Sequence, residues 1–327
     1  MEATTSPHKM EFVAGGAGGL GKALAKLLAA QGSHVTIFGR TKGPLEEAVK
    51  EIERSRLSDA QEIRFVVLDL SDSSQVDSAF REHERIPDTL YCAAGGNHAQ
   101  NGFFVDITAE QVKACMNNNY YATAYPAKSV LDIWIEDDKK HKWKANARTN
   151  VRRIVIISSA AAFLGLPGSI AYTPAKAAVR ALADTLRLEM LRYSSPASKY
   201  SVHISFPGDF ISPGFYQEQN TKTALTKTMQ GLKGSIEDLE KRYPSSEKVA
   251  SLVLEAVKNE EYIICQDSLA ASLLFTNMVG ASPKRGLGIM DSVVGVVVSW
   301  FIWPVLRRRW EGMCKKDGEL WRLEEHE

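Results

Sequence analysis

The chain has 327 residues, a formal net charge of +1 and 44% hydrophobic residues. This length allows one large domain or two smaller ones, and the composition predicts a globular core. Without a basic excess, nucleic acid is not expected as a partner. The four cysteines and seven histidines lack metal-motif spacing. We therefore expect no metal site, and cysteines that are reduced thiols.

Apolar runs of strand length alternate with amphipathic helical runs along most of the chain. The expected strands are residues 11–15, 34–40, 63–69, 89–96, 153–158, 200–206 and 262–265. The expected helices are residues 22–31, 44–56, 71–84, 108–134, 175–193 and 246–258. This alternation predicts an α/β fold, with a doubly wound parallel sheet of the Rossmann type in a single domain over residues 10–267. Ligands of such a sheet bind beyond the carboxyl ends of its strands.

A glycine-rich turn joins the first expected strand to the first expected helix. Gly15, Gly19 and Gly21 have the spacing G-x-x-x-G-x-G, which differs from the G-x-G-x-x-G of the standard dinucleotide fingerprint. Backbone N–H groups of such a turn can approach a pyrophosphate, whose charge the helix N-terminus favours. The position of the turn between a strand and a helix therefore indicates a dinucleotide site.

Arg40 ends the second expected strand, and Lys42 follows it closely. An acidic residue at this position would accept hydrogen bonds from the ribose of NAD, whereas a cation suits the 2′-phosphate of NADP. The basic pair favours NADPH, the alternative being a solvated basic turn. Asp69, at the end of the third strand, is expected at the adenine amino group. Ala94 and Gly95, at the end of the fourth, would let the cofactor ribose approach the backbone.

Tyr172 and Lys176 lie four residues apart, on one face of an expected helix. Pro174 fits only in the first helical turn, which places Tyr172 at the mouth of the helix. A neighbouring ammonium group should lower the pKa of the phenol from about 10, so that it can transfer a proton. Ser159, at the end of a strand, could hydrogen-bond the same substrate oxygen. The alternative is a tyrosine and a lysine on a helix surface.

The local structure of three further segments can be predicted from their composition. The asparagines at 117–119 are poor helix-interior residues, so they indicate a kink or a functional amide. Residues 136–152 are charged and aperiodic, and are expected to form an exposed loop that is either solvated or in contact with anionic lipid. Residues 213–243, polar and weakly helical, are expected to form a substrate lid that continues through the helix ending near residue 260.

Together these features resemble the short-chain dehydrogenase/reductase family over roughly residues 10–267. The matching positions are Gly15, Gly19, Gly21, Asp69, Ala94, Gly95, Asn119, Ser159, Tyr172, Lys176, Pro207 and Gly208. The departures are Ala14 for a threonine, Cys92 and Ala93 for two asparagines, Ala175 for a serine, and Ser212 for a threonine. None of these departures removes a reacting group, although Ala93 affects one supporting hydrogen bond.

The resemblance implies an NADPH-dependent oxidoreductase. It implies that Tyr172 donates a proton, that Lys176 lowers the tyrosine pKa and binds the nicotinamide ribose, that Ser159 orients the carbonyl oxygen, and that Asn119 holds a water. The implied cofactor-binding residues are Gly15, Gly16, Ala17, Gly19, Leu20, Gly21, Arg40, Lys42, Asp69, Leu70, Ala94, Gly95, Tyr172, Lys176, Pro207 and Gly208. A homodimer or homotetramer paired through the helices around 109–134 and 173–193 is also expected.

Within the family the chain is most similar to fungal reductases of 3-ketodihydrosphingosine, a long-chain sphingoid ketone. The stretches that carry this similarity are residues 92–96, 119–120, 158–162, 172–178 and 207–215, with the apolar C-terminal tail. Two alternatives remain. One is a reductase for a steroid, retinoid or fatty acyl ketone. The other is a catalytically silent NADP-binding scaffold tethered to a membrane.

Residues 268–327 are expected to form a tail that associates with membrane lipid. The apolar run 287–306 is long enough to span a bilayer, but Asp291 interrupts it and Pro304 lies near its end. Tryptophans beside the arginines at 307–309 are typical of a membrane interface. We expect a re-entrant or shallow anchor, the alternative being helices packed on the domain or at a dimer interface. By resemblance the membrane is the endoplasmic reticulum, with the catalytic domain facing the cytosol.

Overall fold

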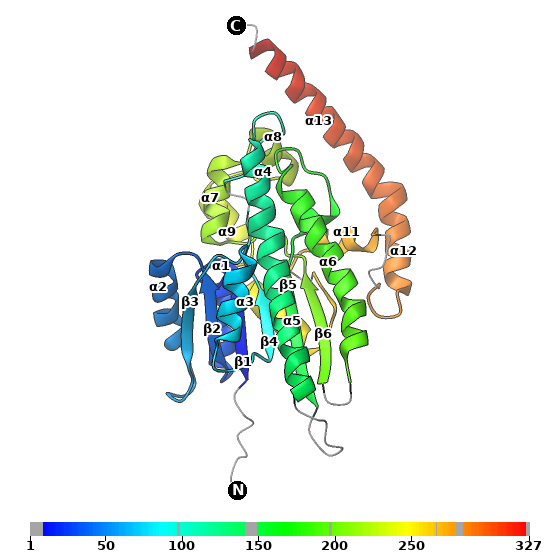
Figure 1. Cartoon of the computed structure of the whole chain (residues 1–327). Helices are drawn as coiled ribbons and strands as arrows, with labels where there is room; N and C mark the ends of the chain where they lie inside the picture. Colours follow the sequence, from blue (N-terminus) through cyan, green and yellow to red (C-terminus); the bar gives the residue numbers. More distant parts are fainter. Residues whose placement is uncertain are drawn as a thin grey trace.

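A computed structural model describes residues 9–96, 99–140, 149–195, 198–265, 267–278 and 284–324 (Figure 1). Its centre is a seven-stranded parallel sheet of order β3-β2-β1-β4-β5-β6-β7. The strands are β1 (Met10–Ala14), β2 (His34–Gly39), β3 (Ile63–Val67), β4 (Thr89–Cys92), β5 (Asn150–Ile157), β6 (Ser198–Ser205) and β7 (Ile263–Ile264). The strand order reverses between β1 and β4, so the predicted doubly wound fold is confirmed.

Helices cover both faces of the sheet. On one face lie α1 (Gly19–Ala30), α2 (Lys42–Glu53) and α10 (Ser246–Lys258). On the other lie α3 (Ser73–Arg81), α5 (Ala122–Lys140) and α6 (Tyr172–Tyr193) (Figure 1). The central strands are thus covered on both sides, and Phe12, Leu90 and Ile154 are fully buried. This double burial explains why the strands read as continuous apolar runs in the sequence.

The long helix expected over 108–134 is interrupted where the three asparagines stand. It consists of α4 (Ala109–Met116), a π-helical turn (Asn117–Tyr121) and α5. The π turn adds one residue to the local hydrogen-bonded ring and so rotates the side chains that follow it. It turns Asn119 inward, where this residue is completely buried. The predicted local distortion is therefore present.

The segment 136–152 differs from the loop that the sequence predicts. The helix α5 continues to Lys140 and β5 begins at Asn150, while residues 141–148 lie outside the described part of the chain. Arg152 is 5% exposed and forms ion pairs with Asp137 and Asp138. The Tyr200 hydroxyl also donates to Asp138. These charged residues are buried by partners from other elements, which a local sequence pattern does not reveal.

Three short helices follow β6 in the region expected to form a lid. They are α7 (Pro213–Thr221), α8 (Ala224–Gln230) and α9 (Ile236–Arg242). Each begins at a hydroxyl side chain that accepts a hydrogen bond from the first helical turn, as is common for N-caps. They lie near α4 at the end of the domain where the strands have their carboxyl ends (Figure 1).

The C-terminal region is helical. It contains α11 (Leu269–Thr276), α12 (Ile289–Val297), a π-helical turn (Val298–Ile302) and α13 (Trp303–Glu324). Within the described residues, Ile289–Met313 is the one helix long and apolar enough to cross a membrane, and its most apolar 18-residue window has a mean hydropathy of 1.9. The continuous helix runs along one side of the domain and projects past its end (Figure 1).

Glu11 is a buried acid in the middle of this fold. It lies on β1 with 2% of the residue exposed, and its Oε2 atom has no hydrogen-bond partner among the described residues. Burial raises the pKa of the Glu11 carboxyl to about 8, although a hydrogen bond with Thr89 opposes the shift. The folded protein therefore keeps a proton on Glu11 between about pH 4.5 and 8, where the unfolded chain releases it.

Glu11→Gln should remove this pH dependence. Because the raised pKa makes folding less favourable as pH rises, the variant should match the parent protein at pH 4.5. It should then become more stable than the parent, by at most about 3 kcal/mol at pH 7. Urea unfolding from pH 4.5 to 8 measures this, with the exposed Glu53→Gln as the matched control. If the free energies of unfolding of the parent and of Glu11→Gln changed with pH in the same way, the burial of a protonated Glu11 carboxyl would be contradicted.

Candidate active site

Ser159, Tyr172 and Lys176 lie together at the carboxyl end of β5. Ser159 is the second residue after the strand, and α6 begins at Tyr172 with a proline in its first turn. The Lys176 Nζ donates to the carbonyl oxygen of Ile157 at 3.0 Å. The Ser158 hydroxyl donates to the carbonyl oxygen of Lys176 at 3.2 Å. These two bonds join the end of the strand to the first turns of the helix, so the three side chains meet although they are separated in sequence.

The pKa of Tyr172 is shifted upward, which is the opposite of the direction predicted from the sequence. Burial raises the pKa of its phenol, and the carboxylates of Glu218 and Asp209 raise it further, whereas a hydrogen bond with Ser159 lowers it. The Lys176 Nζ lies 5.7 Å from the centre of the tyrosine ring and is bonded to a backbone carbonyl. Burial also lowers the pKa of Lys176 to about 8. The expected lowering of the tyrosine pKa by this ammonium group is therefore wrong for the protein alone, because desolvation is the larger effect.

Asn119 clamps the loop that follows β4. Its Nδ2 donates to the carbonyl oxygens of Gly96 and Cys115, both at 2.9 Å, and its Oδ1 accepts from the Gly96 N–H at 3.1 Å. Gly95 has a φ of +150°, and a Cβ added there would lie 2.7 Å from the Asn119 Oδ1 and 3.1 Å from the Lys176 Nζ. Asn119 and Lys176 therefore both border Gly95, where a larger residue would displace them.

The glycine-rich turn leaves the start of α1 open. Gly15 has a φ of +92°, and a Cβ there would lie 2.4 Å from the Ala94 nitrogen. A Cβ on Gly21 would lie 2.1 Å from the Gly15 oxygen, so both positions require glycine. The N-cap of α1 is Gly18, which has no capping side chain, and a Cβ on it would have no neighbour within 4 Å. Uncapped N–H groups beside open space fit a pyrophosphate.

The other predicted residues of this turn lie around it. Gly16 packs against Ile37, because an added Cβ would approach that side chain to 2.5 Å. Leu20 is buried in the core beneath the turn, whereas Ala17 is partly exposed. The structure thus places Gly16 and Leu20 as supports of the turn and leaves Ala17 at its surface.

Arg40 and Lys42 are exposed beyond the end of β2. The Arg40 Nη1 donates to the Asn118 Oδ1 at 3.0 Å, which points its guanidinium group toward the π-helical turn. Because one guanidinium group has five donors, it can bind a phosphate as well. The Lys42 Nζ lies 3.5 Å from the Glu46 carboxylate in an exposed pair within α2. Both cations remain compatible with a 2′-phosphate.

Asp69, Leu70, Pro207 and Gly208 complete the predicted cofactor residues. The Asp69 Oδ1 accepts hydrogen bonds from the backbone N–H and the hydroxyl of Ser71, at 2.9 and 2.8 Å, and Leu70 is buried. The Pro207 carbonyl oxygen accepts from the Ala160 N–H at 2.9 Å. The Gly208 N–H donates to the Asp267 Oδ2, also at 2.9 Å. The loop after β6 is therefore fastened beside Ser159.

A charged cluster near Tyr172 was not identified from the sequence. Lys222 has a side chain that is only 2% exposed, and its Nζ lies 3.1 Å from the Glu218 carboxylate and 3.7 Å from the Asp209 carboxylate. The side chains of Glu218 and Asp209 are 20% and 25% exposed. The i, i+4 spacing of Glu218 and Lys222 is the available sequence signal, but it is common on helix surfaces. Asp209 lies in the loop after β6, and the fold brings it to the same lysine.

Known proteins similar to this chain include several reductases. The chain is 30% identical over 302 residues to the PIGF/3-ketodihydrosphingosine reductase fusion protein of Schizosaccharomyces pombe, covering 92% of this chain and 56% of that protein. It is 28% identical to the 3-ketodihydrosphingosine reductase ksrA of Aspergillus fumigatus, covering 94% and 84%. It is 31% identical to the 3-dehydrosphinganine reductase of Danio rerio, covering 68% and 62%. The chain thus spans less than two thirds of the length of the first and third of these relatives.

Solved structures show the same fold. A short chain dehydrogenase/reductase from Burkholderia phymatum in complex with NAD has a TM-score of 0.64 at 18% identity, covering 83% of this chain and 92% of that one. Levodione reductase has a TM-score of 0.64 at 20% identity, covering 81% and 98%. The profile of the short chain dehydrogenase family matches residues 9–208, which include the glycine turn, Ser159, Tyr172 and Lys176. The chain therefore belongs to the short chain dehydrogenase family.

Proposed function

We propose that this protein is an NADPH-dependent reductase that converts the 3-keto group of 3-ketodihydrosphingosine to a hydroxyl group in sphingolipid biosynthesis. The observation that carries the proposal is the meeting of Ser159, Tyr172 and Lys176 at the sheet edge next to the glycine turn. The names of relatives similar over most of the chain supply the substrate. A catalytically silent scaffold would not need these three residues together.

Each side chain of the site has a separate role in the proposed reaction. When bound, the nicotinamide cofactor supplies a hydride to the ketone carbon. The Tyr172 phenol donates a proton to the ketone oxygen, and its raised pKa keeps it protonated until charge develops there. Ser159 donates a hydrogen bond to the same oxygen. Lys176 stabilises the phenolate that forms, and Asn119 holds the loop against which Lys176 packs.

NADPH is proposed as the cofactor because of the charge at the end of β2. A nicotinamide cofactor is supported by family membership and by a fold neighbour solved with NAD. The open N-terminus of α1 fits its pyrophosphate. Arg40 and Lys42 then lie at the end of β2, where the ribose of the adenosine is bound in Rossmann-type folds. Two cations and no carboxylate at the end of that strand favour a 2′-phosphate.

The charged cluster of Asp209, Glu218 and Lys222 favours a sphingoid ketone over the other lipophilic ketones. The sphingoid ketone has an ammonium group on the carbon next to the ketone, whereas steroid, retinoid and fatty acyl ketones have none. The carboxylates of Glu218 and Asp209 both raise the pKa of the Tyr172 phenol, so they lie within electrostatic reach of the proton donor. These carboxylates would attract an ammonium group placed beside the reacting carbonyl.

Association with the endoplasmic reticulum membrane is proposed for the tail, with the catalytic domain in the cytosol. The apolar helix Ile289–Met313 supports the membrane. The buried free thiols of Cys92, Cys115 and Cys265 suit a reducing compartment. A homodimer paired through α5 and α6 is also proposed. The exposed Leu188 and Leu191 on α6 support it.

Tyr172→Phe should lower kcat by a factor of about 10²–10⁴, because the proton donor is lost. NADPH affinity should change less than threefold, since the phenol contributes little to binding the cofactor. Turnover of 3-ketodihydrosphingosine and fluorescence titration with NADPH measure the two effects. Tyr193→Phe, at the other end of α6, is the control and should retain full activity. Turnover by Tyr172→Phe equal to that of the control would remove Tyr172 from the mechanism.

Arg40→Asp should shift cofactor preference from NADPH toward NADH. The change removes a cation from the 2′-phosphate and places a carboxylate near the ribose hydroxyls. We expect the ratio of kcat/KM for the two cofactors to move by about tenfold or more. Arg56→Asp, just beyond the other end of α2, controls for the change in net charge. An unchanged ratio would exclude Arg40 as the discriminating residue and make Lys42 the next candidate.

Glu218→Gln tests whether the Glu218 carboxylate recognises the amino group of the substrate. At a pH where the amine is protonated, kcat/KM for 3-ketodihydrosphingosine should fall by about tenfold, in keeping with the loss of one hydrogen bond to a charged group. The value for a long-chain ketone without the amino group should stay within twofold. Glu240→Gln, on the neighbouring helix α9, is the matched control. Equal losses for both ketones would show that Glu218 does not recognise the ammonium group.

A further inference from the structure

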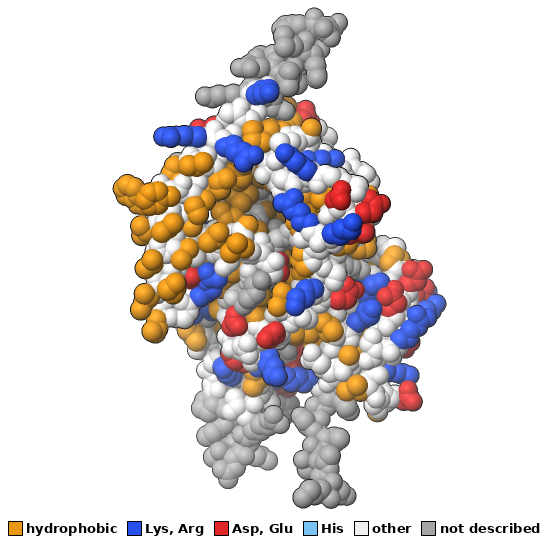
Figure 2. Space-filling model, turned by 180° about the vertical axis from the view of Figure 1, so that it is seen from behind, with side chains coloured by type: hydrophobic (Ala, Val, Ile, Leu, Met, Phe, Trp, Pro, Cys, Tyr) orange, Lys and Arg blue, Asp and Glu red, His pale blue; other side chains and the backbone are white. Residues whose placement is uncertain are grey.

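The outward side of α12 and of the π turn after it is mostly apolar, with Ser292 and Ser299 as its exposed polar residues. We call this surface the apolar face; its residues are Ile289, Met290, Val293, Val296, Val297, Trp300 and Phe301. These side chains are between 46% and 75% exposed. Figure 2 shows hydrophobic side chains in a row along the edge of the molecule where this helix lies. A helix on a domain surrounded by water buries its apolar side, so this arrangement is the reverse of the usual one.

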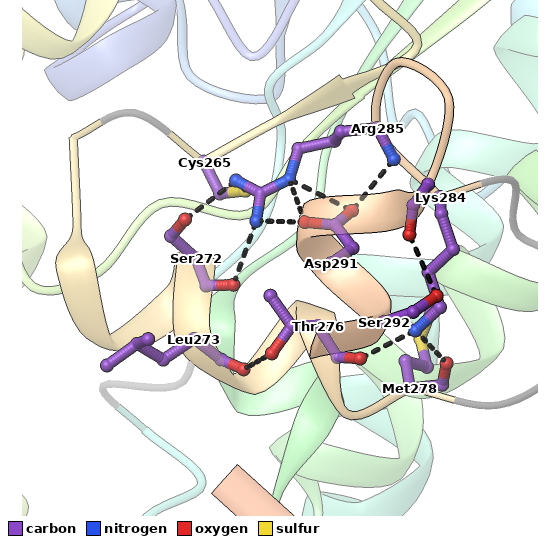
Figure 3. Close-up of polar contacts among 10 residues, drawn as sticks. Cys265, Ser272, Leu273, Thr276, Met278, Lys284, Arg285, Asp291 and Ser292 are labelled. Carbon is purple, nitrogen blue, oxygen red and sulfur yellow. Dashed lines mark hydrogen bonds and ion pairs between the residues drawn. The ribbon is translucent and has the colours of Figure 1, made fainter. Parts of the chain in front are cut away.

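The side of α12 that faces the domain carries its one charged residue. Asp291, Gly295 and Val298 follow one another at helical spacing, and each is buried. Asp291 is 4% exposed and accepts from the Nη2 of Arg285 at 2.7 Å and from the Arg285 backbone N–H at 2.8 Å (Figure 3). The carboxylate is thus neutralised inside the protein. It does not face the medium that surrounds the apolar face.

The same arginine connects α12 to the catalytic domain. The Arg285 Nη1 donates to the Ser272 hydroxyl of α11 at 2.7 Å and lies 3.9 Å from the sulfur of Cys265, at the end of β7 (Figure 3). Its guanidinium group also stacks over the ring of Phe275 at 5.4 Å. Phe275 is 1% exposed and belongs to the core beneath the sheet. Arg285 and Asp291 therefore form a clamp between the apolar helix and the core.

Backbone contacts strengthen this attachment. The Lys284 Nζ donates to the carbonyl oxygens of Thr276 and Met278, at 2.6 and 3.0 Å, and so caps the end of α11. A Cβ on Gly295 would lie 2.6 Å from the Thr276 oxygen, so the two helices touch at that point. The Asn277 Nδ2 donates to the Gly295 carbonyl oxygen at 3.1 Å. The apolar helix is fixed along its length and is not joined by a single flexible link.

The part of the long helix that projects beyond the domain is not apolar. The exposed apolar residues end near Val305, where the helix still lies beside α8. Residues 311–324 of α13 contain charged residues throughout, including Glu311, Lys316 and Asp317. A helix that crosses a bilayer must carry its apolar stretch away from the soluble domain. Here the apolar stretch lies against the domain, so this geometry suits a helix that lies in the membrane surface.

The residues at the end of the apolar face identify lipid as the medium that it contacts. Trp303 and Trp310 pack together with ring centres 5.9 Å apart, and Arg308 and Arg309 beside them are exposed. Tryptophan with arginine at one end of an apolar stretch is typical of the boundary between acyl chains and anionic headgroups. An interface with a second copy of the chain would not require this cationic border.

We propose that the apolar face lies in one leaflet of an anionic bilayer, parallel to its surface, and that the Arg285–Asp291 clamp holds the catalytic domain on this helix in one orientation. The inference rests on the proposed membrane association of the tail and goes beyond it by assigning the mode of insertion. A cavity of about 120 Å³ separates Val298 and Trp303 from Phe163. Phe163 ends the short helical turn that begins after Ser159, so this cavity is lined by a residue four positions along the chain from the predicted site.

Depth measurements on the full chain distinguish a helix in the membrane surface from one that crosses it. Met290→Cys and Phe301→Cys, each made with Cys314→Ser, place an environment-sensitive label at two exposed positions. These positions are eleven residues apart on one helix face, or about 16 Å along the axis. Burial raises the pKa of Cys92 to about 12 and of Cys115 and Cys265 to about 11, so these thiols should not react. Quenching by lipids with nitroxides at graded depths then reports the position of each label.

In vesicles of phosphatidylcholine with about one fifth phosphatidylserine, both labels should lie at similar shallow depths, within about 5 Å of each other. Depths that differ by about 10 Å or more would show a crossing helix and overturn the proposal. Absence of quenching at both positions would show that the face does not enter lipid, and would also overturn it. Neither measurement uses turnover, so an inactive protein with two shallow labels would refute the proposed reaction and leave this inference standing.

Charge substitutions test the apolar face without a label. Val293→Glu should weaken vesicle binding by about tenfold or more, because a carboxylate would enter the acyl region. Leu57→Glu changes a residue that is 71% exposed on the catalytic domain, and should leave binding unchanged. Equal binding by the two variants would overturn the proposal. A different result would be a parent protein that is a dimer in detergent and a Val293→Glu variant that is a monomer, with vesicle binding unchanged. That result would show that the face is an interface between copies.

The clamp has its own test on vesicle-bound protein. Asp291→Asn should make trypsin cleavage after Lys284 and Arg285 at least tenfold faster, because α12 would separate from α11. Asp59→Asn removes an exposed ion pair with Arg56 of similar length, 2.8 Å, and should not change this cleavage. Arg285→Lys keeps the charge and should give an intermediate rate, provided that circular dichroism shows a folded protein. Unchanged cleavage in both clamp variants would refute the clamp.

Discussion

Lys176 carries its ammonium group into a region where only 3% of the residue is exposed. A buried charge is costly unless it has hydrogen-bond partners, and here the carbonyl oxygen at the end of β5 is one of them. The Ser158 hydroxyl returns a bond to the backbone of the same lysine. The end of the central strand and the start of α6 are therefore mutually dependent. The positions of Ser159 and Tyr172 follow from this junction, because each is adjacent to one of its two sides.

The remainder of the site is arranged around this junction by the topology of the sheet. The strand order reverses between β1 and β4, so the glycine turn, the loop clamped by Asn119 and the end of β5 meet at one edge. The end of α7 adds a second buried ammonium group, that of Lys222, which is paired with two carboxylates. Lys176 is bonded to a backbone carbonyl oxygen, whereas Lys222 is paired with carboxylates. The site therefore combines the Tyr172 phenol with two carboxylates that raise its pKa.

The tail is part of the same structure. Phe275 of α11 belongs to the core that supports β5 and β6, and Arg285 packs on its ring while pairing with Asp291 of α12. A charged residue in an apolar run usually argues against insertion into lipid. In this protein the charge faces inward and is neutralised by the domain, so the outward side of the helix carries no charge and is mostly apolar. The junction with the core and the proposed contact with lipid thus occupy opposite sides of one helix.

The sequence alone determined the order of strands and helices. Strands that are buried on both faces are apolar throughout, whereas helices on the surface of the sheet are amphipathic, so the two patterns can be told apart. It also determined which residues stand at the strand ends, and that Tyr172 and Lys176 share a helix face, because Pro174 restricts where that helix begins. Only the tertiary structure decided the direction of the Tyr172 pKa, where burial outweighs the neighbouring lysine. Only the tertiary structure showed Asp137 and Asp138 packed around Arg152, Asp209 and Glu218 joined by Lys222, and Asp291 turned toward Arg285. The physical reason is that local spacing determines secondary structure, whereas the state of a charged group depends on desolvation and on partners that only the folded chain brings together.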